Sequence, residues 1–191
     1  MVIDKLRLLN ELKLKFWNLL KLIKLLKLII NINPLFIIFK DITPLLRDKK
    51  AFQYVVDTLS HYFIDKNIDI VVPIEARGYI IGSAVAYKLS AGIVPVRKQG
   101  KLPSEKIAAA YQLEYGEEVL EIHTDLIKPG ENVLIVDDLI ATGGSAEATK
   151  KLVENLGGKV IGFAFIIELS FLNGREKIKD YNYFALLKYD K

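Results

Sequence analysis

Between residues 133 and 146 the chain changes from a strand pattern to a helix pattern, and this transition constrains the fold more than any other stretch. Four consecutive aliphatic residues, 133–136, are typical of a strand that is buried on both faces. Asp137 and Asp138 come next, at the expected carboxyl end of that strand. A loop of small residues, 141–145, then leads into helical spacing that begins at Ala146.

This layout is typical of a phosphate site. Glycines let successive backbone N–H groups turn toward one anion, and the following helix N-terminus adds the positive end of its dipole. The adjacent carboxylates indicate a ligand that also offers hydroxyl groups or a metal ion. A capped strand-to-helix turn would explain each feature alone, but it does not explain the Gly-Gly pair, the hydroxyl residues and the double acid together.

The remaining apolar pattern predicts an α/β fold. Buried strands are expected at 68–74, 93–96, 160–169 and 183–187, and helices at 48–66, 80–89, 146–156 and 172–179. Strands and helices alternate, which predicts one central, mostly parallel sheet flanked by helices. Gly157 and Gly158 are expected to end the helix that follows the phosphate loop. Residues 104–118 carry few structural signals and are a candidate lid beside the site.

Cations follow two of the other predicted strands. Arg77 lies in a turn after strand 68–74, and its guanidinium is a fork of donors suited to a pyrophosphate. Arg97, Lys98 and Lys101 follow strand 93–96, where three cations within five residues indicate polyanion binding; a solvated charge run is the alternative. The carboxyl ends of parallel strands meet at one sheet edge, so these cations are expected near Asp137.

The charge of the chain is concentrated at its start. Residues 1–30 carry seven of the 27 basic residues and two of the 23 acidic ones, which leaves 20 and 21 in residues 31–191. The pI near 9.0 is therefore weak evidence for nucleic-acid binding. The absence of cysteine excludes disulfides and thiolate chemistry. The two histidines, His61 and His123, are far apart in sequence and do not suggest a metal cluster.

Residues 1–30 have helical spacing rich in Leu and Lys. Two interpretations stay open: a helix that packs on its own domain or on a partner subunit, and a basic amphipathic helix that lies on a membrane surface. The longest uncharged run, 28–39, is too short and too interrupted to span a bilayer, and no signal-peptide cleavage site is evident.

Several motifs resemble those of one family. The run from Asp137 to Ser145 is similar to the phosphoribosyl-pyrophosphate (PRPP) motif of type I phosphoribosyltransferases, and in particular of adenine phosphoribosyltransferases. The resemblance covers residues 36–190 and implies a single-domain type I phosphoribosyltransferase fold with a flexible catalytic loop and an N-terminal base-covering segment. Residues 1–35 lie outside it and are expected to form a separate, atypical basic helical segment that precedes the domain at 36–191.

The resemblance also implies roles for individual residues. PRPP would contact the turn at Glu75, Ala76 and Arg77, the cations Arg97, Lys98 and Lys101, the acids Asp137 and Asp138, and the loop residues Ala141, Thr142, Gly143, Gly144 and Ser145. Adenine would contact Ile38, Phe39, Lys40 and Leu169. Glu114 would be the general acid/base, assisted by Arg77 and Lys98. The family often has a non-proline cis peptide in its pyrophosphate loop, which here falls between Glu75 and Ala76.

The activity that follows from this resemblance is purine salvage, in which adenine and PRPP give AMP and pyrophosphate. The resemblance implies Mg²⁺ held mainly by PRPP rather than by protein ligands, a homodimer, and a cytoplasmic location, with no nucleic-acid partner and no required membrane contact. Two alternatives remain. One is a phosphoribosyltransferase for hypoxanthine, guanine or xanthine, and the other is a non-catalytic, PRPP-sensing regulator.

Overall fold

The structure, a computed structural model, describes residues 28–32, 37–112 and 116–190. Its contacts divide the chain into two units, Met1–Val55 and Val56–Lys191. In the first unit, strands β1 (Leu28–Ile32) and β2 (Ile37–Lys40) pair antiparallel. The short helix α2 (Thr43–Arg47) follows, and α3 (Lys49–Phe63) begins in this unit and ends in the second. The helical pattern expected at 1–30 is wrong for residues 28–30, which pair with β2 as part of β1. The rest of that segment and the boundary predicted after residue 35 fall outside the described residues and stay predictions.

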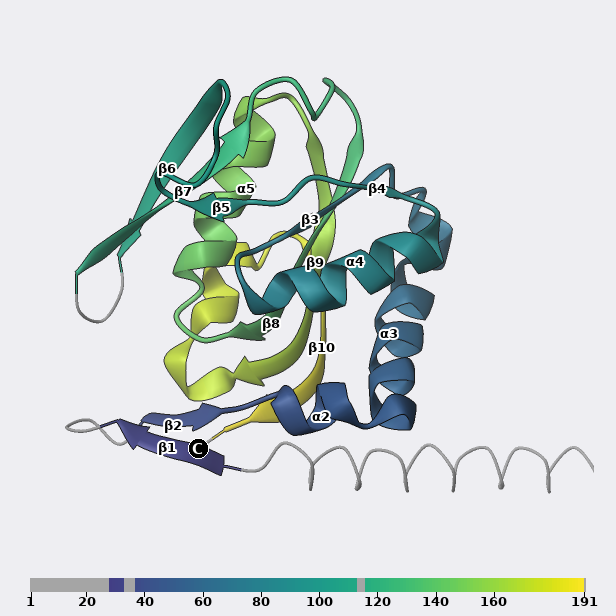
Figure 1. Cartoon of the computed structure of the whole chain (residues 1–191), viewed down its shortest axis with the longest axis vertical. Coiled ribbons are helices and arrows are strands. Elements are labelled where there is room, and N and C mark those ends of the chain that lie inside the picture. Colours follow the sequence, from purple (N-terminus) through teal and green to yellow (C-terminus); the bar gives the residue numbers. More distant parts are fainter. Residues whose placement is uncertain (1–27, 33–36, 113–115, 191) are drawn as a thin grey trace, which may run out of the picture. The chain divides into compact units, whose positions relative to one another are not determined.

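The second unit is built on a parallel sheet of five strands (Figure 1). The strands are β3 (Ile70–Pro73), β4 (Gly92–Ile93), β8 (Asn132–Ile140), β9 (Lys159–Leu169) and β10 (Asn182–Tyr189). Their order is β10-β9-β8-β3-β4, and every neighbouring pair is parallel. The sequence prediction of a parallel α/β core is confirmed. The carboxyl end of β3 lies beside the middle of β8, immediately before Asp137, since Pro73 pairs with Val136.

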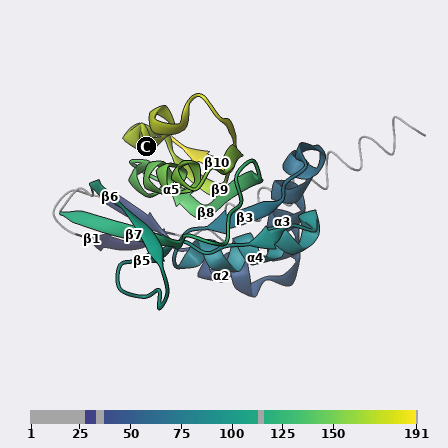
Figure 2. The same cartoon turned by 90° about the horizontal axis from the view of Figure 1, so that it is seen from above.

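Alternation along the strands divides the core between two faces of the sheet. Val133 and Ile135 of β8 belong to one apolar cluster with Leu152 and Val153 of α5 (Gly144–Asn155). The helix α4 (Arg77–Leu89) packs on β3 and β8 and lies on the other side of the sheet from α5 (Figure 2). Its Gly82 approaches Pro73 so closely that a Cβ would come within 2.6 Å of the proline Cβ. The missing side chain at Gly82 therefore lets this helix pack closely on the sheet.

A separate antiparallel sheet of three strands includes part of the segment 104–118, where few structural signals were expected. It contains β5 (Arg97–Lys98), β6 (Lys106–Gln112) and β7 (Glu117–His123) in the order β5-β7-β6. That expectation was wrong because residues 108–110 are alanines with little strand propensity of their own. Pairing with β7 through seven consecutive residues makes them a strand.

Other predicted boundaries need smaller corrections. The regular strand at the site expected for 93–96 is only Gly92–Ile93. Its pairing with β3 nevertheless continues, since the N–H groups of Val94 and Val96 donate to the carbonyls of Val71 and Pro73, and Val96 forms an isolated bridge with Ile74. The helix expected at 172–179 is two 3₁₀ turns, η2 (Ser170–Leu172) and η3 (Gly174–Ile178), separated at Asn173, whose φ is 54°. Helix 48–66 ends as an α-helix at Phe63 and continues as the 3₁₀ turn η1 (Ile64–Lys66).

The end of α5 is as predicted. Gly157 has a φ of 84°, and the N–H groups of Gly157 and Gly158 donate to the carbonyls of Glu154 and Val153, which satisfies the last turn. Within the described part of the chain, no helix has both the length and the apolar character that crossing a bilayer requires.

Candidate active site

The turn between β3 and α4 carries the first group of site residues. The peptide bond between Glu75 and Ala76 is cis, as the family resemblance implied. Arg77 is the first residue of α4, and Gly78 follows it. A Cβ on Gly78 would lie 2.9 Å from the carbonyl oxygen of Val136 and 3.0 Å from Oδ1 of Asp137. The missing side chain therefore lets the start of α4 approach the acidic end of β8.

The second group comes from β8 and the start of α5. The strand extends to Ile140, so Asp137 and Asp138 lie within it rather than after it, and both are buried. Helix α5 begins at Gly144, two residues earlier than predicted, with Gly143 at a φ of 74° as its N-cap. That left-handed conformation favours glycine and turns the loop toward the helix N-terminus. The predicted strand, acids, loop and helix are confirmed as one continuous unit.

These segments surround a cavity of about 340 Å³ in the second unit. Its lining combines three carboxylate-bearing segments with two cations and a hydroxyl of α5. The lining residues are Ile74, Glu75, Ala76, Arg77, Lys98, Tyr111, Glu118, Asp137, Asp138 and Ser145. Seven of the residues predicted to bind PRPP therefore meet around one cavity.

The buried acids and Arg77 form one hydrogen-bonded group. Arg77 Nε donates to Oδ2 of Asp138, whose side chain is only 4% exposed. The backbone N–H of Asp138 donates to Oδ1 of Asp137 at 2.8 Å. Burial, together with the neighbouring charge of Asp138, raises the pKa of Asp137 well above its ordinary value. Arg77 lowers that pKa, but it does not reverse the shift.

Glu75 organises the cations that follow β4. Its Oε1 accepts from Lys101 Nζ, its Oε2 accepts the backbone N–H of Lys98 at 2.8 Å, and Arg97 Nε lies 3.7 Å from Oε2. Arg97 also donates from Nη1 to the carbonyl oxygen of Lys101 at 3.0 Å. Burial would raise the pKa of Glu75, but these hydrogen bonds and charges outweigh it and lower the pKa. Glu75 stays ionised and holds the loop that carries the three cations.

Not every predicted residue reaches this cavity in the structure. Ala141, Thr142, Gly143 and Gly144 form the loop and helix start beside Ser145. Leu169 is buried at the end of β9, in the same sheet. Ile38, Phe39 and Lys40 lie on β2 of the first unit, and only their backbone is described. Glu114 lies outside the described residues, so its predicted role stays a prediction.

Three cavity residues were not predicted from the sequence, Ile74, Tyr111 and Glu118. The hydroxyl of Tyr111 donates to Glu118 Oε2 at 2.6 Å, and Lys98 Nζ donates to Glu118 Oε1 at 2.7 Å. These hydrogen bonds lower the pKa of Glu118. Burial and the neighbouring Glu118 raise the pKa of Tyr111. A hairpin prediction across Gly116 would have placed Tyr111 and Glu118 opposite each other.

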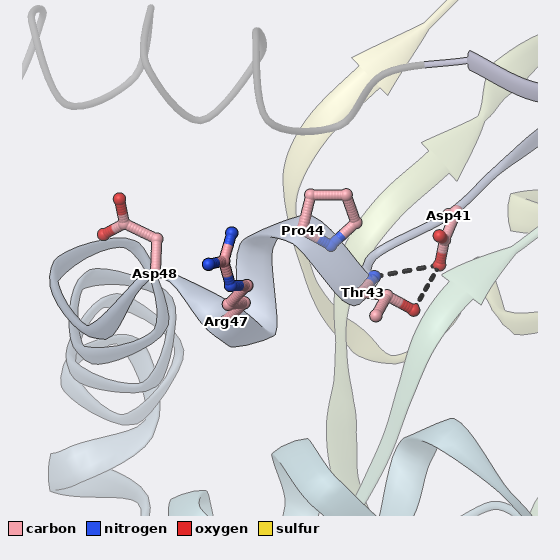
Figure 3. Close-up of a pocket in the computed structure, with 5 residues that line it drawn as sticks. All are labelled: Asp41, Thr43, Pro44, Arg47 and Asp48. Carbon is pink, nitrogen blue, oxygen red and sulfur yellow. Dashed lines mark hydrogen bonds between the residues drawn. The ribbon is translucent and has the colours of Figure 1, made fainter.

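The first unit contains a pocket of its own, on α2 and the residues that flank it (Figure 3). Asp41 Oδ1 accepts both the backbone N–H of Thr43 at 2.9 Å and its hydroxyl at 2.7 Å, and so orders the entry to α2. Pro44 lies in the first turn of this helix, where its missing N–H costs no hydrogen bond. The remaining lining residues are Arg47 and Asp48.

Comparison with known proteins connects this geometry to one family. A family model described as a phosphoribosyl transferase domain matches residues 45–189. Adenine phosphoribosyltransferase from Alkaliphilus metalliredigens is 60% identical over 151 residues, which are 79% of this chain and 89% of that protein. The enzyme of the same name from Clostridium acetobutylicum is 53% identical over 152 residues, 80% of this chain and 88% of that protein.

Solved structures agree with the sequence comparison. The crystal structure of adenine phosphoribosyltransferase from Thermoanaerobacter pseudethanolicus has a TM-score of 0.86 at 45% identity and covers 90% of this chain and 99% of that one. The Saccharomyces cerevisiae enzyme, complexed with an imino-altritol bisphosphate and adenine, has a TM-score of 0.82 at 41% identity, over 89% of this chain and 98% of that one.

Proposed function

Because the chain belongs to the phosphoribosyltransferase family, we propose that it transfers the 5-phosphoribosyl group of PRPP to N9 of adenine, giving AMP and pyrophosphate. The observation that supports this most is the cavity at the carboxyl edge of the sheet, where a phosphate loop, two buried carboxylates and cations converge. The named relatives, which are adenine phosphoribosyltransferases at up to 60% identity among those compared, support adenine as the base.

The 5′-phosphate would lie at the start of α5. Backbone N–H groups of residues 141–145 and the hydroxyls of Thr142 and Ser145 are donors, and the 12-residue helix adds its positive end. Asp137 and Asp138 would accept hydrogen bonds from the ribose hydroxyls. Their negative charge would also stabilise the positive charge that develops on the ring as the C1–O bond breaks, as in glycoside chemistry.

The pyrophosphate would lie between the turn at Glu75–Ala76 and the cations that follow β3 and β4, which are Arg77, Arg97, Lys98 and Lys101. Three of these cations already have a carboxylate partner in the structure. Arg77 pairs with Asp138, Lys98 with Glu118 and Lys101 with Glu75. The cations are therefore held in place before the anionic group arrives, which reduces the ordering cost of binding.

The carboxylates of the cavity can accept hydrogen bonds from the water shell of an Mg²⁺ ion that PRPP carries. Among residues 41–112 and 116–190, no three His, Asp or Glu side chains converge to hold a metal by themselves. Mg²⁺ commonly keeps several waters and binds through substrate phosphates, and Asp137 and Asp138 would accept hydrogen bonds from that shell. When bound, the ion would neutralise charge on the departing pyrophosphate.

The residues that would contact adenine and transfer its proton are predicted from the family resemblance alone. Phe39 would stack on adenine, main-chain groups of Ile38 and Lys40 would read its edge, and Leu169 would pack on the ring. Glu114, which lies outside the described residues, would handle the purine proton. We also propose that the enzyme is a cytoplasmic homodimer, as its family suggests; light scattering coupled to gel filtration would measure its mass.

The decisive experiment is AMP formation from PRPP and Mg²⁺ with adenine, hypoxanthine, guanine or xanthine in parallel. We expect turnover with adenine at least tenfold above that with the other bases, since a 6-amino and a 6-oxo group have opposite hydrogen-bond polarity. Preference for a 6-oxo base would reassign the substrate. PRPP binding without turnover on any base would favour the regulatory alternative.

A further inference from the structure

The hairpin of β6 and β7 contributes two side chains to the cavity wall. Tyr111 and Glu118 are directly opposite each other in the antiparallel register, and the tyrosine hydroxyl donates to Glu118 Oε2 at 2.6 Å. Both side chains line the cavity with Arg77, Lys98 and Ser145. The pair therefore forms part of the cavity wall between the cations and the start of α5. The reaction proposed above gives neither residue a role.

Glu118 joins this hairpin to Lys98. Lys98 Nζ donates to Glu118 Oε1 at 2.7 Å, and both carboxylate oxygens therefore have a partner. The Lys98 side chain is 47% exposed and would otherwise sample several rotamers. A half-exposed ion pair of this kind contributes little to folding stability. Its main physical effect is to select one position for the ammonium group.

Tyr111 joins the same chain of contacts to the phosphate loop. A Cβ on Gly144 would come within 2.8 Å of Tyr111 Cδ2, so the ring lies directly against the first residue of α5. Strand β6 also contacts α5 elsewhere along its length. One continuous bridge therefore links the start of α5 to the ammonium of Lys98, through the ring and hydroxyl of Tyr111 and the carboxylate of Glu118.

We propose that Glu118, held by Tyr111, is a positioning residue that places Lys98 for the pyrophosphate of PRPP. The anion then meets a cation whose distance from the phosphate loop is already set. This inference rests on the proposed function, because it takes Lys98 as a pyrophosphate ligand. It assigns Glu118 an action only through Lys98, and none on the purine or on the ribose.

The chain offers a matched control one residue away. Glu117 lies on the same strand, opposite Gln112, whose Nε2 donates to Glu117 Oε2 at 2.8 Å. Successive strand residues face opposite sides, and Glu117 does not line the cavity. Glu117→Gln therefore removes the same charge and perturbs a similar cross-strand pair, without touching Lys98.

The experiment is a double-mutant cycle on Glu118 and Lys98, with PRPP affinity measured by calorimetry and the PRPP KM and kcat by AMP formation. Glu118→Gln should raise the PRPP Kd and KM by roughly tenfold, a typical coupling for neighbouring charged groups, with a much smaller change in kcat. In the Lys98→Ala background the same change should have no effect. Tyr111→Phe should weaken PRPP binding less than Glu118→Gln does, and Glu117→Gln should leave it unchanged.

Each other outcome overturns the proposal. Tighter PRPP binding by Glu118→Gln would mean that Glu118 only repels the substrate, and additive effects with Lys98→Ala would mean that it acts elsewhere. Equal losses in Glu117→Gln would indicate a general charge effect. The proposed function fails separately, if the wild-type chain binds PRPP but forms no AMP; the calorimetric cycle would then still decide the role of Glu118.

Discussion

The backbone at Gly143 packs against the backbone at Gly174 so closely that neither residue has room for a side chain. A Cβ on Gly143 would collide with the carbonyl group of Gly174, and a Cβ on Gly174 would collide with the carbonyl oxygen of Ala141. The backbone at the start of η3 therefore supports the phosphate loop from behind. The loop's shape depends on Gly174, which follows Gly143 by 31 residues in the chain.

Gly174→Ala should displace the phosphate loop and weaken PRPP binding. We expect the PRPP KM to rise tenfold or more, together with an overpacking cost of about 1–3 kcal/mol in unfolding free energy. The measurement is steady-state kinetics with varied PRPP, alongside thermal melting. Gly158→Ala is the control, because its Cβ would be 2.8 Å from Val153 Cγ1, away from the loop. It should lower Tm without changing the PRPP KM; equal KM effects would contradict the prediction.

Asp137→Asn should raise Tm and weaken PRPP binding at the same time. Burial, and then the charge of Asp138, raises the pKa of Asp137 in the folded protein. A carboxyl whose pKa is higher in the folded than in the unfolded protein stabilises the fold fully below its unfolded pKa of 3.8. That stabilisation is lost as the pH rises through the folded pKa. Asparagine stays neutral, so the variant should melt above the wild type at pH 8, and the difference should shrink toward pH 4.

The control for this experiment is Asp65→Asn, the same charge change at an exposed position in η1. It should leave Tm unchanged at both pH values, since surface substitutions of this kind are usually close to neutral. A Tm difference for Asp137→Asn that did not depend on pH would show that packing, rather than ionisation, causes it.

Arg77→Ala should weaken both PRPP binding and the fold. The substitution removes a charged donor from Asp138, which is buried, and we expect a loss of about 1–3 kcal/mol in urea unfolding at pH 7. Arg77→Lys keeps the charge but loses the fork of donors, so its PRPP KM should still rise. In an Asp138→Asn background the stability cost of Arg77→Ala should fall. A cost that remained unchanged would place the effect outside the Arg77–Asp138 pair.

Glu114→Gln should lower kcat by roughly 10²-fold or more, the usual range for a general acid/base, while PRPP affinity changes little. Single-turnover kinetics and PRPP calorimetry separate the two quantities. Gln retains the size of the side chain and removes only its ability to exchange a proton at neutral pH. Unchanged turnover would remove Glu114 from the chemistry.

The parts of the site that could be predicted are those in which function depends on adjacent residues. The double acid and the glycine loop are contiguous with the strand and helix that position them, and the structure contains them as one unit. Arg77 and Lys98 were also placed at the correct sheet edge, because parallel strands end together. Even there the boundaries moved, since β8 continues through both acids to Ile140.

The parts that could not be predicted depend on pairing between distant residues. Tyr111 lies opposite Glu118 only in the register of the β6–β7 hairpin. Strand β6 is hard to predict because it contains a run of alanines, which have low strand propensity. Gly174 contacts Ala141 and Gly143, which precede it by 33 and 31 residues, and no local pattern marks that approach. The sequence by itself determined the α/β class, the family and the position of the motifs that we propose bind PRPP, because each depends on local spacing and residue chemistry. Only the tertiary structure decided which carboxylate holds which cation and which backbone supports the loop, because those contacts arise from packing.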